Sequence, residues 1–456
     1  MERALQVRLL DVNYHYARSL NGLCRVNDMV FSKDRSIILQ SSYIACVVIS
    51  VFLFSILFYN FTEFLSIPVY DALLIVWPAL LFDLGRSVGK AVILPMDVIL
   101  RSLRPPPKDF KPRLISIIIP ARNQEKTIGS CIEAILENNY LWKEVVVVDD
   151  GSEDNTYFVA KKYEETGVVK VVRKDPSGYK ASSVNYGLLF SKGEIVLSLD
   201  ADTLVSRDSL GWVARYFEDE RLVAGAGNLR VLNRDVNLLT RLQAYEYFAA
   251  FEMGRRTQSL LRTLLIIPGA AAIYRRSLLE SLGFLDRTLA EDFDVTLKFH
   301  KVRGKLIFMP EVLAWTEVPV NWRGWIRQRI RWSMGQLHSL RRHSQLFFRR
   351  RFGVPGLIGA PDMVLVDMVL LFAWSIWLTW VILAQIPITT LFMLLVPVLL
   401  YSELLTISTS RIVSKDPEPF SILILFPLAT FFYRPLYGIV RYIGYLYEVL
   451  GKQRRW

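Results

Sequence analysis

Cysteine and histidine are scarce in this sequence. Three cysteines, Cys24, Cys46 and Cys131, and four scattered histidines stand among 456 residues. Three thiols make no disulfide framework, and no CxxC pair or cysteine–histidine cluster has the spacing of zinc ligands. The sequence therefore excludes the small disulfide-stapled and zinc-finger classes of protein.

Acidic residues are also in deficit. The chain has 55 lysines and arginines against 43 acidic residues, which gives a net charge of +12 at pH 7. Such an excess favours nucleic acid, an anionic lipid surface or an anionic substrate as partner. Much of it flanks oily segments and no nucleic-acid-binding motif occurs, so we expect a lipid bilayer as partner and no nucleic acid. Residues 1–35 are mixed and polar, unlike a secretory signal peptide.

Long apolar runs are abundant towards both ends of the chain. Four of them approach the ~20 residues that cross a bilayer and are predicted to span it: 41–61, 69–85, 363–384 and 388–407. The oily stretch 420–450 is interrupted by Arg434 and Arg441. It is either a further span whose arginines face a protein interior or a shallow interfacial helix. The expected total is four or five spans.

The uneven distribution of basic residues around the spans predicts the orientation of the chain in the membrane. Basic residues precede the first span and follow the second, including Lys33, Arg86 and Lys90, whereas the loop between the two spans has none. The positive-inside bias then places both flanks in the cytoplasm. We therefore predict a multi-pass protein of the cell membrane with four regions. They are a cytosolic segment (1–37), two transmembrane helices (38–104), a cytosolic domain (105–345), and two or three transmembrane helices with interfacial segments (346–456).

The cytosolic region alternates strand and helix patterns. Residues 114–120, 144–150 and 193–202 read as buried strands, with helical patterns between them. This alternation predicts an α/β domain with a doubly wound, mostly parallel sheet that is covered on both faces. Ligands of such sheets bind at the carboxyl ends of the strands.

Acidic side chains follow two of these strands. Asp149 and Asp150 end VVVVDD, and Asp200 and Asp202 form a DxD pair after EIVL. A strand-end carboxylate can accept from a nucleobase or a ribose hydroxyl, and paired hard oxygen ligands suit magnesium or manganese. Ordinary Asp-Gly turns and helix caps give the same patterns, so neither signal is specific alone.

Two more segments carry candidate chemistry. Glu291 and Asp292 begin a predicted helix, where a carboxylate can act as a general base or can simply complement the helix dipole. Lys180 stands at a loop-to-helix junction, which fits a phosphate, although a solvated surface lysine has the same pattern.

The stretch RQRIRWSMGQ, residues 327–336, predicts an amphipathic helix. Gln328, Arg331 and Trp332 share one face at positions i, i+3 and i+4. A guanidinium can pair a pyrophosphate, and an indole offers a flat surface to a sugar ring. We expect the apolar stripe behind them to rest on the membrane, and a peripheral helix with snorkelling arginines is the alternative. That stripe consists of Ile326, Ile330, Met334 and Leu337.

The order of these motifs is more informative than any one of them. DDG, lysine, DxD, ED and QxxRW follow one another between membrane spans, and roughly residues 70–450 resemble the processive, inverting family 2 glycosyltransferases. These include cellulose, chitin, hyaluronan and poly-N-acetylglucosamine synthases. The poly-β-1,6-N-acetylglucosamine synthase branch is most similar in five segments: 224–234, 243–261, 268–279, 313–332 and 433–440.

The resemblance implies a fold and a set of roles. The fold is an α/β cytosolic domain of GT-A type, inserted between α-helical transmembrane segments and accompanied by amphipathic interfacial helices. Asp149 or Asp150 would hold uracil, and Asp200 and Asp202 would bind ribose and a magnesium or manganese ion. Lys180 and Arg331 would neutralise the diphosphate. Asp292, beside Glu291, would be the catalytic base, Trp332 would support the acceptor sugar, and Gln328 would lie near the diphosphate or the acceptor.

The implied activity is transfer of N-acetylglucosamine from UDP-GlcNAc, with inversion, to a growing β-linked polysaccharide that crosses the membrane. Hyaluronan, chitin, a cellulose-like glucan or mannan are alternative products. A lipid-linked monosaccharide ranks lower because such synthases generally lack QxxRW. Accessory subunits occur in this family, and the sequence specifies none. A transporter or receptor with a degenerate nucleotide-binding domain is a further alternative, against which the intact acidic motifs argue.

Two departures from the family pattern stand out. Ala290 replaces the threonine that usually precedes the Glu-Asp pair, and the final oily stretch is shorter and richer in arginine than the resemblance implies.

Overall fold

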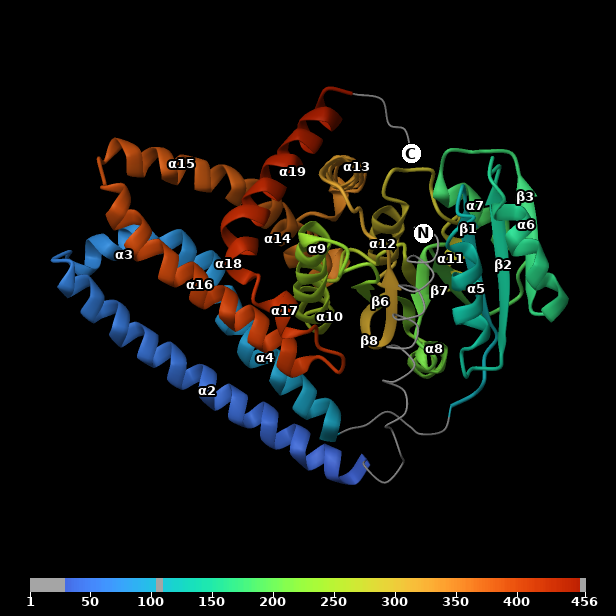
Figure 1. Ribbon diagram of the computed structural model, residues 1–456, viewed down its shortest axis with the longest axis horizontal. Coiled ribbons are helices and arrows are strands. Elements are labelled where there is room, and N and C mark those ends of the chain that lie inside the picture. Colours follow the sequence, from blue (N-terminus) through green and yellow to red (C-terminus); the bar gives the residue numbers. More distant parts are fainter. Residues whose placement is uncertain (1–28, 104–109, 452–456) are drawn as a thin grey trace, which may run out of the picture.

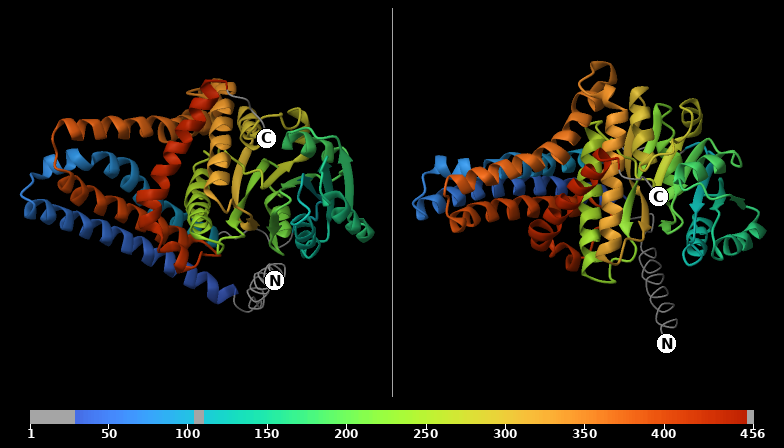
Figure 2. Two further views of the ribbon diagram at one scale, coloured as in Figure 1. Left: turned by 45° about the horizontal axis from the view of Figure 1, so that its top comes forward. Right: turned by 90° about the horizontal axis from the view of Figure 1, so that it is seen from above.

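The computed structural model describes residues 29–103 and 110–451. Apolar helices from both ends of the chain form one part, and an α/β part comes from the middle (Figure 1). Figure 2 shows the blue and the orange-red helices side by side, so the two ends of the sequence form one helical bundle. Residues 1–28 of the predicted segment 1–37 lie outside the described residues.

The α/β part is built on an eight-stranded sheet in the order β3-β2-β1-β4-β7-β6-β8-β5. The first four strands are parallel, β7 runs antiparallel to β4 and β6, and β5 runs antiparallel to β8. The predicted doubly wound sheet is confirmed, with β7 and β5 as its antiparallel members. The strands are β1 (Ile115–Ala121), β2 (Lys143–Asp150), β3 (Val169–Lys174), β4 (Ile195–Leu199), β5 (Thr203–Val205), β6 (Leu222–Val231), β7 (Ala271–Arg275) and β8 (Lys305–Thr316).

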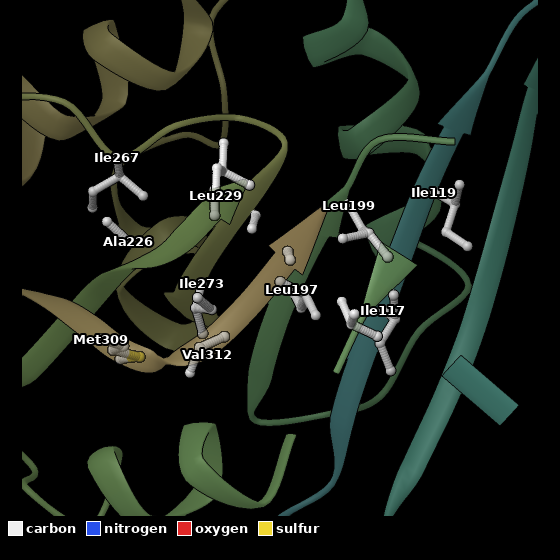
Figure 3. Close-up of a cluster of buried hydrophobic side chains, with 14 of the residues drawn as sticks. Ile117, Ile119, Leu197, Leu199, Ala226, Leu229, Ile267, Ile273, Met309 and Val312 are labelled. Carbon is white, nitrogen blue, oxygen red and sulfur yellow. The ribbon is translucent and has the colours of Figure 1, made fainter. Parts of the chain in front are cut away.

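The central strands carry branched aliphatic side chains that are buried in the core. Ile117 in β1, Leu197 in β4 and Ile273 in β7 have almost no exposed surface, as expected where helices cover both faces of a sheet. Figure 3 shows these side chains gathered in one hydrophobic cluster across the neighbouring strands. This core fixes the strand ends from which the polar side chains of the candidate site project.

Helix α9 (Leu238–Ala249) separates the sheet from the apolar helices in Figure 1, and it packs on both β6 and α16. It begins with a reciprocal cap, because Asn237 and Thr240 each accept from the backbone N–H of the other at 3.0 Å. The other helices of the α/β part are α5 (Ile128–Leu136), α6 (Thr156–Lys161), α7 (Lys180–Leu188), α8 (Ser209–Tyr216), α10 (Arg256–Leu260), α11 (Arg276–Ser281), α12 (Glu291–Lys301) and α13 (Trp322–Arg342).

Among the described residues, four helices are long and apolar enough to cross a membrane: Ser36–Phe64, Val69–Leu103, Ile388–Val413 and Phe420–Val449. The predicted span 363–384 contains only a shorter apolar helix, Ala373–Leu383. The corresponding elements are α2 (Met29–Phe64), α3 (Val69–Pro78), the π-helix η2 (Ala79–Leu84), α4 (Gly85–Leu103), α15 (Leu370–Leu383), α16 (Ile388–Val413), α17 (Phe420–Leu423), α18 (Phe426–Leu428), the π-helix η9 (Ala429–Tyr433) and α19 (Arg434–Val449).

The second of these helices continues past residue 85, where the sequence predicted its span to end. Asp71 and Asp83, near the two ends of the predicted span, motivated the shorter prediction. In the structure Arg86 donates to both carboxylate oxygens of Asp362, at 2.8 and 3.2 Å. A charged group among apolar helices is tolerated when it is paired, so the helix continues through Arg86.

Arg434, inside the last oily stretch, is paired in a similar way. It donates to both oxygens of Glu403 in α16, one of them at 2.8 Å. Tyr245 of α9 donates to the same carboxylate, which is almost fully buried. This arrangement fits the interpretation in which Arg434 meets a protein partner rather than lipid.

The junction between the two parts of the molecule holds a buried charge network. Glu252 accepts from Arg230 and Arg256, each at 2.5 Å, and from Ser414 just after α16 at 2.9 Å. Burial raises the pKa of Glu252, but Arg256 and Arg230 outweigh it and lower the pKa to about 2. The carboxylate thus stays charged and ties the α/β part to the end of the apolar helix α16.

We expect Glu252→Gln to lower the free energy of unfolding by about 3–5 kcal/mol, because it leaves two buried guanidinium groups without their counter-charge. Glu220→Gln is the control, since its side chain is 67% exposed beside Arg113 and Arg275 and should cost less than about 1 kcal/mol. Denaturant or thermal unfolding in detergent measures both. Equal losses would contradict the expectation.

Candidate active site

Two acidic side chains end β2, as the sequence predicted. Asp149 is fully buried, and its carboxylate lies 3.0 Å from Nε of Arg173. Asp150 accepts from Lys174 at 2.5 Å and from both the backbone and the hydroxyl of Ser177. Burial alone raises the pKa of Asp150, but Lys174 and Ser177 outweigh it, and the pKa lies below its ordinary value.

Four predicted site residues converge at Gly269. A β-carbon built on Gly269 would lie 3.0 Å from Lys180 Nζ, 3.4 Å from Glu291 Oε1 and 3.5 Å from Asp292 Oδ2. Lys180 is ion-paired with Asp200 and also donates to the Gly269 carbonyl at 3.0 Å. The fold therefore brings together side chains from the start of α7, the end of β4 and the start of α12.

Lys180 balances the negative charge at this point. Its side chain is 9% exposed. Burial alone lowers the pKa of Lys180, but the carboxylates of Asp200, Glu291 and Asp292 outweigh burial and raise it. The lysine is thus held protonated in a pocket rich in acids, which excludes the alternative of a solvated surface lysine.

Glu291 and Asp292 differ in environment although they are neighbours. Glu291 is 8% exposed, and burial followed by repulsion from Asp292 raises its pKa to about 7. Asp292 is half-buried and oriented by two backbone N–H groups, from Gly269 at 2.9 Å and from Phe293 at 2.7 Å. Glu291 therefore resists ionisation, whereas Asp292 is accessible and fixed in direction.

Asp202 completes the DxD pair. Its Oδ1 atom accepts from the hydroxyls of Thr203 and Thr316, both at 3.3 Å. Burial, then the charges of Asp200 and Glu317, raise the pKa of Asp202 to about 7. A divalent cation would relieve this repulsion, and the donors are the hard oxygens that magnesium and manganese prefer.

The two aspartates supply only part of a metal-binding shell. Within the described part of the chain, no three or more His, Cys, Asp or Glu side chains are grouped to hold an ion. Magnesium commonly binds one or two carboxylates and takes its remaining ligands from substrate phosphates and water. Asp200 and Asp202 fit that partial role.

One face of α13 is directed at the start of α12. Gln328, Arg331, Trp332 and Gly335 follow at i, i+3, i+4 and i+7 and so share that face. A β-carbon on Gly335 would meet the β-carbon of Ala290 at 2.6 Å, so the helix lies directly against the residue before Glu291. Gln328 Oε1 is buried without a hydrogen-bond partner, and Trp332 is half-buried.

The apolar stripe of α13 was expected to rest on the membrane. Instead, Ile326 and Ile330 pack against the main hydrophobic cluster, and Met334 is buried. Helix α19 covers this side of α13: a β-carbon on Gly444 would lie 3.0 Å from the Ile330 carbonyl. The glycine permits close helix packing, and this excludes lipid from the stripe.

Two residues near the site, Glu317 and Arg329, were not singled out from the sequence. Glu317 follows β8 as Asp200 follows β4, so the strand-end rule could have identified it. Arg329 is fully buried and pairs with Glu246 at 2.7 Å. Asp294 accepts from His343 at 2.9 Å and thereby ties α12 to the end of α13. No sequence signal distinguished Arg329 from the other arginines of its helix.

Residues 116–283 match the model for "Glycosyl transferase family 2". This part of the chain is a family 2 glycosyltransferase domain. The matched range contains Asp149, Lys180, Asp200 and Gly269, whereas Asp292 and α13 lie beyond it.

The glycosyltransferase domain has curated relatives. The chain is 29% identical over 223 residues to a poly-beta-1,6-N-acetyl-D-glucosamine synthase of Staphylococcus epidermidis. The aligned region covers 48% of this chain and 54% of the relative. The chain is also 30% identical over 244 residues to the probable glycosyltransferase YdaM of Bacillus subtilis, with 52% and 58% covered. The chain thus spans little more than half the length of these relatives.

A solved structure shares the fold. A mannosyltransferase from Pyrobaculum calidifontis, determined with GDP-Man and Mn2+, superposes with a TM-score of 0.53 at 20% identity and covers 81% of this chain and 99% of its own. The glycosyltransferase domain therefore has the expected GT-A architecture, flanked by apolar helices that could cross a membrane.

The raised pKa of Glu291 makes stability depend on pH. A folded-state pKa of about 7 against an ordinary 4.5 means that the wild type loses stability as pH rises through that window. We expect the stability of Glu291→Gln, whose side chain does not ionise, to increase progressively relative to that of the wild type from pH 4 to pH 8. Melting temperatures of the metal-free protein across this range measure the gain. A difference that is constant with pH would contradict the assignment.

Proposed function

We propose that this protein is a membrane-embedded, processive glycosyltransferase. It transfers N-acetylglucosamine from UDP-GlcNAc, with inversion, to a growing β-linked polysaccharide and moves the polymer across the membrane. The observation that carries the proposal is the convergence of Lys180, Asp200, Glu291 and Asp292 around Gly269 in a family 2 glycosyltransferase domain.

Asp292 suits the role of general base better than Glu291. A base must reach the acceptor hydroxyl in its ionised form. Burial disfavours ionisation of Glu291, whereas Asp292 is half-buried and aimed by two backbone N–H groups. The acceptor oxygen attacks the anomeric carbon, its proton passes to Asp292, and the bond to the diphosphate breaks with both electrons leaving on the nucleotide. A single displacement of this kind inverts the anomeric centre.

Positive charge at the site stabilises the departing diphosphate. Lys180 is already held protonated beside Asp200, and Arg331 lies on the α13 face directed at α12. A magnesium or manganese ion held by Asp200 and Asp202 would add electrostatic stabilisation of the leaving group. Asp149 and Asp150, at the end of β2, are assigned to the nucleoside. Because the internal partners of Asp150 occupy both its oxygens and Asp149 is fully buried beside Arg173, either residue would have to exchange partners to bind uracil.

Two side chains on the face of α13 that is directed at α12 suit the binding of an acceptor sugar. Trp332 offers a flat apolar surface of the kind on which sugar rings stack, and the buried Gln328 Oε1 has no partner of its own. Both share a helix face with Gly335, which meets Ala290, two residues before the proposed base. An acceptor sugar on Trp332 would therefore lie close to Asp292.

The donor assignment rests on the relatives rather than on pocket shape. Poly-beta-1,6-N-acetyl-D-glucosamine synthases are among the relatives, so UDP-GlcNAc is the favoured donor. Hyaluronan, chitin, glucan or mannan synthesis remains the alternative with the same machinery. Product analysis after incubation with UDP-GlcNAc, UDP-glucose, UDP-glucuronate and GDP-mannose decides between them. Polymer from UDP-glucose alone would overturn the GlcNAc assignment.

We expect Asp292→Asn to reduce polymer synthesis by at least about 10²-fold, the lower range for loss of a general base. Binding of UDP should change little, because the nucleotide is assigned to other residues. Incorporation of labelled UDP-GlcNAc by purified protein with magnesium, together with UDP binding, measures both. Glu153→Gln on an exposed turn is the control. Full incorporation by Asp292→Asn would show that the base is misassigned.

We also propose that the catalytic domain faces the cytoplasm, as the basic flanks indicate. In a Cys24→Ser, Cys46→Ser background, Ser66→Cys in the turn between α2 and α3 should react with an impermeant maleimide in intact cells. Gln345→Cys, exposed after α13, should react only after lysis. The reverse pattern would overturn the orientation.

A further inference from the structure

Helix α9 carries two adjacent polar residues that contact different parts of the molecule. Glu246 accepts from Arg329 of α13 at 2.7 Å and from the Tyr433 hydroxyl at 2.5 Å. The neighbouring Tyr245 donates to Glu403 of the membrane helix α16. One turn of α9 therefore contacts both the helix that bears Trp332 and the apolar bundle.

Arg329 is enclosed by aromatic rings. Its guanidinium carbon lies 4.2 Å from the centre of the Trp332 ring, 5.2 Å from that of Tyr437 and 5.8 Å from that of Trp325. The side chain is fully buried, and its Nε and Nη1 atoms have no hydrogen-bond partner. Glu246 and the ring faces thus supply the interactions that keep this charge in the interior.

Burial of an arginine is costly, and an apolar side chain would fill the same space without that cost. The position of Arg329 gives its charge a role beside Trp332. It lies against the indole of Trp332, three residues further along the same helix, and so restricts the orientation of that ring. The exposed arginines of α13, such as Arg323 and Arg327, lie outside this enclosure.

The network continues into the membrane helices through α19. Tyr433, which donates to Glu246, also accepts from Trp325 Nε1 at 2.7 Å. The next residue, Arg434, pairs with Glu403, the same carboxylate that Tyr245 contacts. Two pairs of adjacent residues, Tyr245–Glu246 and Tyr433–Arg434, thus connect α13 with α16.

We propose that Arg329 and Glu246 are positioning residues for the acceptor. They hold the Trp332 ring in the orientation that receives the end of the polysaccharide, and Tyr433 and Tyr245 fix that orientation relative to the membrane helices. The proposal rests on the function proposed above and adds residues to its acceptor site. It gives a role to the most deeply buried arginine of α13, which stands at the first variable position within QxxRW.

The test separates acceptor binding from donor binding. Glu246→Gln removes the counter-charge of Arg329, and Tyr433→Phe removes one hydroxyl with little risk to folding. Kinetics are measured with UDP-GlcNAc and a short β-linked N-acetylglucosamine oligosaccharide as acceptor. We expect the acceptor KM to rise about tenfold in Glu246→Gln, with a smaller rise in Tyr433→Phe. The donor KM should stay within about twofold of the wild type, and polymer chains should be shorter.

Arg323→Gln, on the exposed side of α13, is the matched control and should keep both KM values. An unchanged acceptor KM in Glu246→Gln and Tyr433→Phe would overturn the positioning role. So would a parallel change of donor KM, acceptor KM and melting temperature, because that pattern marks a merely structural network. A wild-type protein that releases no UDP from any nucleotide sugar would instead overturn the proposed function.

Discussion

Repulsion between carboxylates is the constraint on which the candidate site depends. The ends of β4 and β8 and the start of α12 bring Asp200, Asp202, Glu317, Glu291 and Asp292 into one region. A cluster of like charges in a half-buried site destabilises the fold unless cations or protons offset it. Lys180 offsets part of the charge from within the protein. Burial and the remaining negative charge raise the pKa of Asp202 and Glu291, and they give the site an affinity for further positive charge.

This excess of negative charge also sets a condition on the proposed nucleotide-sugar donor, whose diphosphate is itself anionic. The ligand is compatible with the aspartates only when a cation lies between them, so metal and donor would bind together. The protein then needs few fixed ligands of its own, in keeping with the two-aspartate arrangement. In the proposed function, Lys180 and the face of α13 would stabilise charge on the leaving diphosphate.

Buried charges also govern the connection between the α/β part and the apolar bundle. Here each carboxylate is paired with arginine instead of being repelled by other carboxylates. Glu252 pairs with Arg230 and Arg256, and Glu403 pairs with Arg434. Such pairs are directional, and breaking one leaves a buried charge that costs several kcal/mol. They therefore hold α9, α16 and α19 in one arrangement more strictly than apolar contacts alone would, and this arrangement determines where α13 lies.

Much of the fold followed from local sequence. Runs of isoleucine and valine specified the buried strands, and the order of the strands and helices predicted the sheet, because βαβ connections place successive strands in a narrow range of arrangements. The carboxyl-edge rule then placed Asp149, Asp150, Asp200 and Asp202 without knowledge of distant contacts. The antiparallel direction of β7 could not be inferred in this way, because its neighbours β4 and β6 are set by long-range pairing.

The sequence by itself determined which residue types stand at strand ends and helix starts, and which segments are apolar enough for a membrane. Tertiary structure alone decided how charges far apart in the chain are paired. It placed Asp362 beside Arg86, in a helix that continues beyond its predicted end, and Glu246 beside Arg329, which singled out one arginine among several. It also placed α19 over the apolar stripe that was expected to contact lipid. The reason is that burial and pairing energies depend on neighbours in space, and local patterns do not contain that information.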